Sequence, residues 1–153
     1  MNIDGRLKEL GIRLPEAPKP LGAYVPFVRT GNLLFLSGVL PLRNGCLTKS
    51  GRVGDTVSLE EAKEGAKQIV VNALSILKAA VDDLNTVRRC VKLNGYVASS
   101  EDFTDQPKVL NAASDLLFEI FGEAGRHARS AVGVFSLPLN SPIEIDFIFE
   151  IEI

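Results

Sequence analysis

The chain has few of the residues that metal sites and disulfide frameworks require. It contains a single histidine, His127, and two cysteines, Cys46 and Cys90, which do not form a Cys-x-x-Cys motif. One imidazole cannot build a histidine-based metal cluster, and two isolated thiols do not make a disulfide framework. We therefore expect no metal site, and reduced thiols of the kind found in cytosolic proteins.

An excess of positive charge and a long apolar run are also missing. The 17 Lys and Arg residues are outnumbered by 19 Asp and Glu residues, so no overall positive field attracts nucleic acid or an anionic membrane. Polar residues interrupt the longest apolar segment before it reaches the roughly 18 residues that a membrane span needs. The first residues also lack the basic and apolar regions of a secretory signal. These absences predict a cytoplasmic protein with neither a nucleic-acid partner nor a membrane partner.

What is present is the composition of one globular domain. The 153 residues are 46% hydrophobic and 24% charged, which is enough apolar material for a single core. The first 23 residues differ from the rest, because Pro15, Pro18 and Pro20 favour extended backbone. We predict an N-terminal arm over residues 1–23 and one domain over residues 24–153.

The domain begins with the pattern of a β-hairpin. Apolar runs at 24–28 and 33–40 flank Thr30, Gly31 and Asn32, which are turn formers. The polar, Gly-rich segment 43–57 that follows is typical of a surface loop with room for a small strand.

Two helices are predicted from capping residues and apolar spacing. Ser58 and Glu61 form the S-x-x-E pattern of a capping box, and apolar residues recur every three or four positions as far as Val81. A second helix should start near Asp105, with Pro107 in its first turn, and end near Gly122.

Alternating residues predict three further strands, over 87–98, 127–134 and 143–153. In the strand at 143–153 the odd positions are Ile or Phe and most even positions are acidic. In the strand at 87–98, Cys90 falls among the alternate positions that carry polar residues. The element order ββ(β)αβαββ predicts an α+β sandwich with two helices on one face of a mixed sheet. The uncovered face can contact water or pack against identical sheets in a homo-oligomer.

Arg129 is the candidate binding residue of the strand at 127–134. Alternation places it on one face with His127, Ala131 and Gly133, and places the valines on the other. We expect the valine face to belong to the core, so that Arg129 projects from the opposite face with free volume beside the small Ala131. The simpler alternative is that the small residues admit a neighbouring backbone and that Arg129 pairs with an acidic residue of the last strand.

Glu144, at the start of the last strand, is the candidate catalytic partner. If the last two strands are neighbours, Glu144 lies within reach of Arg129. An Arg fork suits a substrate carboxylate, and a nearby Glu can orient or deprotonate a water molecule. The alternative is an exposed ion pair between strands, worth only about 0–1 kcal/mol.

These residues belong to a pattern that resembles a known family. The run RSAVGVFSLPLNSPIEIDFIFE at 129–150, with SGVLP at 37–41 and GAY at 22–24, is similar to the YjgF/RidA family of reactive-intermediate (enamine/imine) deaminases, which is also described as endoribonuclease L-PSP-like. The resemblance covers about residues 22–153 in the same element order. It implies a chorismate-mutase-like fold and a homotrimer whose sheets form a central barrel, with three clefts between subunits.

The resemblance also implies an activity, the hydrolytic deamination of small 2-enamino or 2-imino acids to 2-keto acids and ammonia without a cofactor. By position, Arg129 would bind the substrate carboxylate and Glu144 would orient the hydrolytic water. The other positions carried over would line the cleft; they are Tyr24, Ser37, Gly38, Asn111 and Ala131. Ala131 stands where the family often has Cys, and Val39 where it often has Gln.

Two other functions remain open. The same clefts would serve a non-catalytic protein that senses a small carboxylate or keto acid. Ribonuclease or translation-inhibiting activity, a name that some family members carry, has little support because the chain lacks a basic stripe and a histidine pair. Ser37 has no histidine partner other than His127 for a nucleophilic triad, and no motif marks Cys90 as a reactive thiol.

Overall fold

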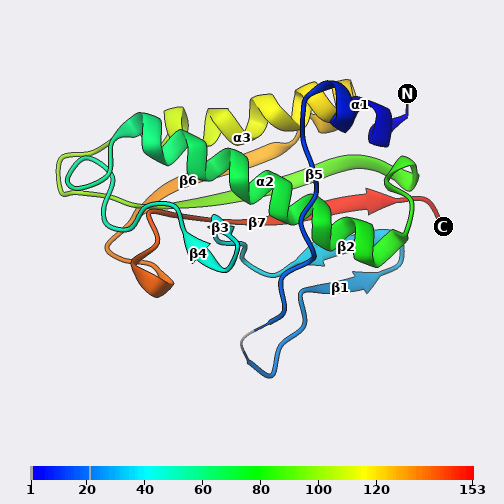
Figure 1. Ribbon diagram of the computed structural model, residues 1–153, viewed down its shortest axis with the longest axis horizontal. Helices are drawn as coiled ribbons and strands as arrows, with labels where there is room; N and C mark the ends of the chain where they lie inside the picture. Colours follow the sequence, from blue (N-terminus) through cyan, green and yellow to red (C-terminus); the bar gives the residue numbers. More distant parts are fainter. Residues whose placement is uncertain (1, 21) are drawn as a thin grey trace.

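A five-stranded sheet covered on one face by two helices forms the body of the molecule, as Figure 1 shows for the computed structural model. The structure describes residues 2–20 and 22–153. The strand order is β1-β2-β7-β5-β6, in which β5 and β6 run parallel and the other pairs antiparallel. A mixed α+β fold is thereby confirmed.

The helices and strands have the following bounds. The sheet strands are β1 (Phe27–Thr30), β2 (Leu33–Leu36), β5 (Val87–Ala98), β6 (Ala128–Val134) and β7 (Ile143–Ile151), and the helices are α1 (Ile3–Glu9), α2 (Leu59–Val81) and α3 (Gln106–Phe121). A separate small hairpin, β3 (Leu42–Arg43) and β4 (Cys46–Leu47), begins one residue before the predicted loop at 43–57 and extends into it. The predicted hairpin is formed by β1 and β2.

Helix α2 begins at the predicted capping box. The hydroxyl of Ser58 accepts from the backbone N–H of Glu61 at 3.1 Å, and the Glu61 carboxylate accepts from the Ser58 N–H at 3.1 Å. These two bonds satisfy donors that the first turn leaves free. The apolar stripe that continues from this start is buried against the sheet, with Ile69 and Leu77 fully covered.

Helix α3 lies close to the sheet because β5 has a glycine beneath it. A Cβ atom at Gly95 would collide with the side chain of Leu110, which is fully buried. Pro107 stands in the first turn as predicted, where its missing N–H costs no helical bond.

Strand β7 is central and alternates as the sequence predicts. Its odd positions, from Ile143 to Ile151, are buried and its even positions are half-buried. Strand β5 departs from simple alternation, because its register with β7 shifts between Val87 and Arg89 and again between Cys90 and Lys92. The prediction that Cys90 lies on the polar face is therefore wrong; its side chain is buried in the core.

The N-terminal segment lies over the helical layer. Ile3 and Leu7 of α1 are buried, and α1 lies beside α3, after which the chain crosses α2 on its way to β1 (Figure 1). Met1 and Leu21, which belong to the predicted arm, lie outside the described residues. The division at residue 23 between an arm and a domain stays a prediction.

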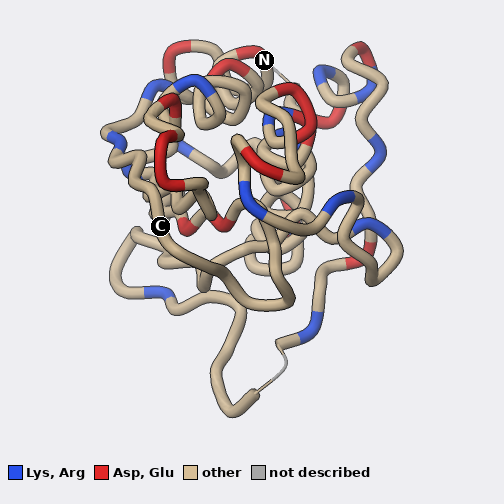
Figure 2. Tube along the Cα trace, turned by 90° about the vertical axis from the view of Figure 1, so that its left-hand side faces the viewer, with Lys and Arg blue, Asp and Glu red and all other residues tan. Residues whose placement is uncertain are grey.

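The charged side chains are unevenly distributed. Figure 2 shows acidic and basic residues spread over most of the chain, whereas the segment at 22–26, at the bottom of both views, carries none. Among the described residues, none of the helices is both long enough and apolar enough to cross a membrane.

Candidate active site

Arg129 lies on the edge strand β6, and its side chain points to the helical side of the sheet. Its Cα pairs with that of Leu93 on β5, which is buried in the core, and residues paired across strands share a face. The Nη1 group of Arg129 donates to Oδ1 of Asn111 at 2.9 Å and to Oγ of Ser114 at 3.1 Å, both on α3. Helix α3 therefore holds the guanidinium from one side.

The prediction that Arg129 projects from the non-core face is wrong. The valine face is the open one, since Val132 is 45% exposed while Ala131 packs against the core. A Cβ atom at Gly133 would lie 2.7 Å from Nε2 of Gln106 on α3. The small residues therefore admit the helix rather than create an open pocket floor. Alternation alone does not say which face of an edge strand a helix covers.

Glu144 lies on the opposite, open face of the sheet. Its Cα pairs with that of Tyr96, three residues after Leu93 on β5, so the two positions face opposite ways. The last two strands are not neighbours, because β5 lies between them. The condition that would have put Glu144 within reach of Arg129 is therefore not met in a single chain.

The surroundings of Glu144 favour its protonated form. Burial raises the pKa of this carboxyl, and the negative charge of Asp146 raises it further. Gly38 lies directly against it, since a Cβ atom at Gly38 would be 2.9 Å from Cδ of Glu144. A carboxyl whose pKa is raised toward neutrality is suited to exchanging protons with a bound water.

Three polar residues that no sequence motif marks form a network beside Glu144. Asn94 donates from Nδ2 to Oδ1 of Asp146 at 2.8 Å, and the hydroxyl of Tyr96 donates to Oδ2 of Asp146 at 3.0 Å. Burial, and then this bond to Asp146, raises the pKa of Tyr96. In the sequence these three residues alternate with buried residues. That alternation indicates that they lie on the open face of the sheet, but it does not indicate a function.

Ser37 fixes the segment that carries Tyr24. Its hydroxyl donates to the carbonyl of Val25 at 2.6 Å, and its N–H donates to the carbonyl of Pro26 at 2.9 Å. Tyr24 is 53% exposed. The segment is thus tied to the end of β2, next to Gly38.

The predicted site residues consequently fall into two groups. The first, which we call the arginine group, lies on the helical side and comprises Arg129, Asn111 and Ala131. The second, which we call the glutamate group, comprises Glu144, Gly38 and Ser37, with Tyr24 tethered to it.

A pocket of about 380 Å³ opens beside the arginine group. Arg126 in its wall is already engaged, because Nε lies 3.0 Å from Oε2 of Glu123 and the guanidinium stacks 4.6 Å from the ring centre of Phe118. Arg129 is the guanidinium that remains for an anion. The lining residues are Ser114, Asp115, Phe118, Gly125, Arg126, His127 and Arg129.

His127 shares the face of Arg129, as predicted, and contacts the same serine. Nε2 of His127 lies 3.0 Å from Oγ of Ser114, and Nδ1 lies 3.1 Å from the carbonyl oxygen of Ala128. Burial lowers the pKa of His127, and the charge of Arg129 lowers it further. Ser114 was missed in the sequence; its position three residues after Asn111 on one helix was the available signal.

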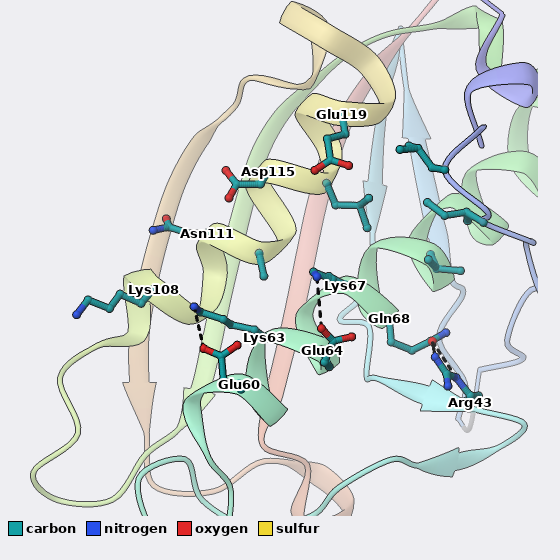
Figure 3. Close-up of a pocket in the computed structure, with 15 residues that line it drawn as sticks. Arg43, Glu60, Lys63, Glu64, Lys67, Gln68, Lys108, Asn111, Asp115 and Glu119 are labelled. Carbon is teal, nitrogen blue, oxygen red and sulfur yellow. Dashed lines mark hydrogen bonds and ion pairs between the residues drawn. The ribbon is translucent and has the colours of Figure 1, made fainter. Parts of the chain in front are cut away.

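A larger groove of about 700 Å³ lies between α2 and α3 (Figure 3). The charges on its α2 rim are paired within the chain, since Lys63 contacts Glu60 at 3.2 Å and Lys67 contacts Glu64 at 3.3 Å. Asn111 lines this groove as well as binding Arg129, so α3 separates the groove from the arginine group.

The remaining candidate ligands and nucleophiles are the acidic side chains, His127 and the cysteines. In the described ranges 2–20 and 22–153, no three His, Cys, Asp or Glu side chains are placed to hold a metal ion. Burial raises the pKa of the Cys90 thiol to about 12, which leaves it protonated and unreactive at neutral pH.

The chain is similar along almost its whole length to curated proteins. Protein TCP17 of Trypanosoma cruzi is 42% identical, over 97% of this chain and 94% of that protein. A 2-iminobutanoate/2-iminopropanoate deaminase of Dermatophagoides farinae is 30% identical, over 92% of this chain and 95% of that protein. Reactive Intermediate Deaminase A of Arabidopsis thaliana is 33% identical, over 93% of this chain and 66% of that protein.

Solved structures share the fold closely. A protein of unknown function from Agrobacterium tumefaciens matches with a TM-score of 0.92 and 49% identity, over 98% of this chain and 92% of that chain. The YjgF gene product of E. coli matches with a TM-score of 0.66 and 26% identity, over 90% of this chain and 94% of that chain. A family model described as "YjgF/chorismate_mutase-like, putative endoribonuclease" matches residues 4–151. The chain therefore belongs to the YjgF/chorismate-mutase-like family, as its C-terminal motif indicated.

Proposed function

We propose that the protein hydrolyses small 2-imino acids, and their 2-enamino tautomers, to 2-keto acids and ammonia. The observation that carries the proposal is the way Arg129 is held. Both bonds from α3 use Nη1, and within the described residues no hydrogen-bond partner contacts Nη2 or Nε. That free edge of the guanidinium has the fork geometry that binds a carboxylate with two parallel bonds.

The glutamate group supplies the hydrolytic step. Glu144 accepts a proton from a water molecule while the water oxygen bonds to the C=N carbon, and it passes this proton to the nitrogen, giving a carbinolamine. Glu144 then takes the hydroxyl proton of the carbinolamine and delivers it to the nitrogen as the C–N bond breaks, so that ammonia and the 2-keto acid are released and Glu144 is again ionised. One water is consumed and no electrons are transferred, so the reaction needs no redox partner. Two relatives named as deaminases support this chemistry.

The separation of the two groups supports an active site between subunits. Arg129 and Glu144 face opposite sides of the sheet, so one substrate cannot touch both within one chain. In a homotrimer, Arg129 of one copy would face Glu144 of the next. Each of the three interfaces would then hold one cleft.

The test generates 2-iminobutanoate in situ with an amino acid oxidase and follows keto acid and ammonia formation. We expect acceleration over buffer, and a loss of roughly 10- to 100-fold in kcat/KM for Arg129→Ala, which removes charged hydrogen bonds to the substrate. Arg126→Ala is the matched control, because Arg126 lies in the same pocket wall but is paired with Glu123. Unchanged turnover in Arg129→Ala would refute the assignment. A keto acid that binds without any turnover would identify a sensor instead.

The shared cleft has a test of its own. Arg129→Ala and Glu144→Gln should each have strongly reduced activity, but co-refolded mixtures should regain part of the wild-type activity, since some interfaces would join the intact Arg of one copy to the intact Glu of another. No recovery of activity in mixed trimers would refute the shared cleft.

A further inference from the structure

The bonds around Arg129 continue to a third residue. Ser114 contacts both Nη1 of Arg129, at 3.1 Å, and Nε2 of His127, at 3.0 Å. His127 lies two residues before Arg129 on the same face of the chain, and Ser114 faces them from α3. The three side chains thus form a continuous chain of hydrogen bonds along the wall of the 380 Å³ pocket.

The partners fix the direction of every bond in this chain. The carbonyl of Ala128 can only accept, so Nδ1 of His127 carries the proton. In a neutral imidazole Nε2 is then the acceptor, and the hydroxyl of Ser114 donates to it. With its proton turned to His127, Ser114 presents a lone pair to Arg129.

We propose that Ser114 and His127 are positioning residues that hold the Arg129 guanidinium in the plane required to bind the substrate carboxylate; the catalytic part of this inference rests on the function proposed above. Nη1 has two N–H groups, and Asn111 and Ser114 accept one each. Both bonds together set the plane of the guanidinium and leave Nη2 and Nε for the ligand. Without an acceptor at His127, the Ser114 hydroxyl can turn its proton toward Arg129 and lose that bond.

The charges around His127 are consistent with its role as an acceptor. The pocket that His127 lines has three other charged residues in its wall. Arg126 and Arg129 come from the segment of His127 itself, and Asp115 comes from α3. Burial and the charge of Arg129 both lower the pKa of His127, so the imidazole is neutral at pH 7 and Nε2 keeps its lone pair.

The kinetic test compares two substitutions of His127. His127→Leu removes the acceptor, whereas His127→Gln keeps an oxygen near the position of Nε2. We expect His127→Leu to raise KM for the imino acid, and Kd for a keto acid, by roughly 2- to 10-fold, the effect of one neutral hydrogen bond, with kcat changed less than about twofold. His127→Gln should restore the wild-type KM. A merely structural histidine would leave KM unchanged in both variants, and that result would overturn the proposal.

A second measurement does not depend on catalysis. Long-range ¹H–¹⁵N spectra of the histidine ring distinguish the two neutral tautomers, and His127 is the single histidine of the chain. We expect the Nδ1–H tautomer in the wild type and an increased share of Nε2–H in Ser114→Ala, with wild-type behaviour restored by Ser114→Thr. An Nε2–H tautomer in the wild type would refute the chain of bonds even if deamination is confirmed. If deamination fails, the tautomer still tests the geometry.

Discussion

At the scale of single residues, Glu144 is the group whose ionisation controls the proposed reaction. Its pKa lies above the ordinary value of 4.5 because of burial first and the charge of Asp146 second. The folded chain therefore binds this proton more tightly than the unfolded chain does. As the pH rises from 4.5 through the raised pKa, Glu144 contributes progressively less to the stability of the fold.

The same shift predicts the acidic limb of the pH profile. Glu144 accepts a proton from water only when ionised, so kcat/KM should fall on acidification at a pH above 4.5. Asp146→Asn removes the neighbouring charge and should move this limb to lower pH. Glu152→Gln, at the exposed end of the chain, is the control and should leave it in place. An unmoved limb in Asp146→Asn would show that Asp146 does not influence Glu144.

The two cysteines should differ sharply in reactivity. Cys46 is exposed, whereas Cys90 is buried and the pKa of its thiol is about 12. A thiol reagent at pH 8 should therefore modify Cys46 alone in the native protein and both cysteines in denaturant. Mass spectrometry of the labelled peptides identifies which cysteine has reacted. Rapid modification of Cys90 in the native protein would contradict its burial.

The sequence predicted individual residues better than their surroundings. The acidic face of Glu144 followed from strict alternation in one strand, because buried Ile and Phe at every odd position leave a single orientation. The face of Arg129 did not follow, because its strand has valines on one side and small residues on the other, and small residues can mark either open space or a close helix. Ser114 could not be recognised before α3 was seen to lie over β6.

At the scale of elements, local signals were the most reliable. The capping box of α2 depends on residues three positions apart and was confirmed. The side-chain orientations along β5 could not be predicted, because its two bulges are irregularities in the pairing with β7, which lies far away in the sequence. Strand order depends likewise on contacts between distant segments, which is why β5 was not expected between β6 and β7.

The close approach of two elements at Gly38 predicts a selective loss of activity. Gly38→Ala should displace the carboxyl of Glu144, which would otherwise lie 2.9 Å from the new Cβ atom, and lower kcat by roughly 10- to 100-fold, the effect of a misplaced catalytic group. The fold should survive because a flexible side chain can move aside. Gly5→Ala is the control, since the nearest atoms there are 3.9 Å away. Wild-type kcat in Gly38→Ala would separate Gly38 from catalysis.

At the scale of the whole molecule, the uncovered sheet face has an apolar patch. Val28 pairs with Phe35, and Phe35 with Ile148 across the next strand, so the three residues form one row on this face. Val28 and Phe35 remain 55% and 41% exposed. An apolar row of this kind is suited to contact with identical sheets.

We therefore expect light scattering to give three times the mass of one chain for the wild type, and a smaller species for Phe35→Glu. Ile153→Glu is the control, because Ile153 is an apolar residue that is 100% exposed but lies beyond the end of β7. A wild-type monomer, or a Phe35→Glu trimer, would contradict assembly through this face.

The position of Arg129 on an edge strand has a further consequence for how the protein behaves in solution. If each cleft joins a guanidinium from one copy to a carboxylate from another, an isolated copy has only half of the groups that turnover needs. Activity per chain should then fall steeply when the protein is diluted below the concentration at which copies associate. Raising the protein concentration again should restore the activity per chain.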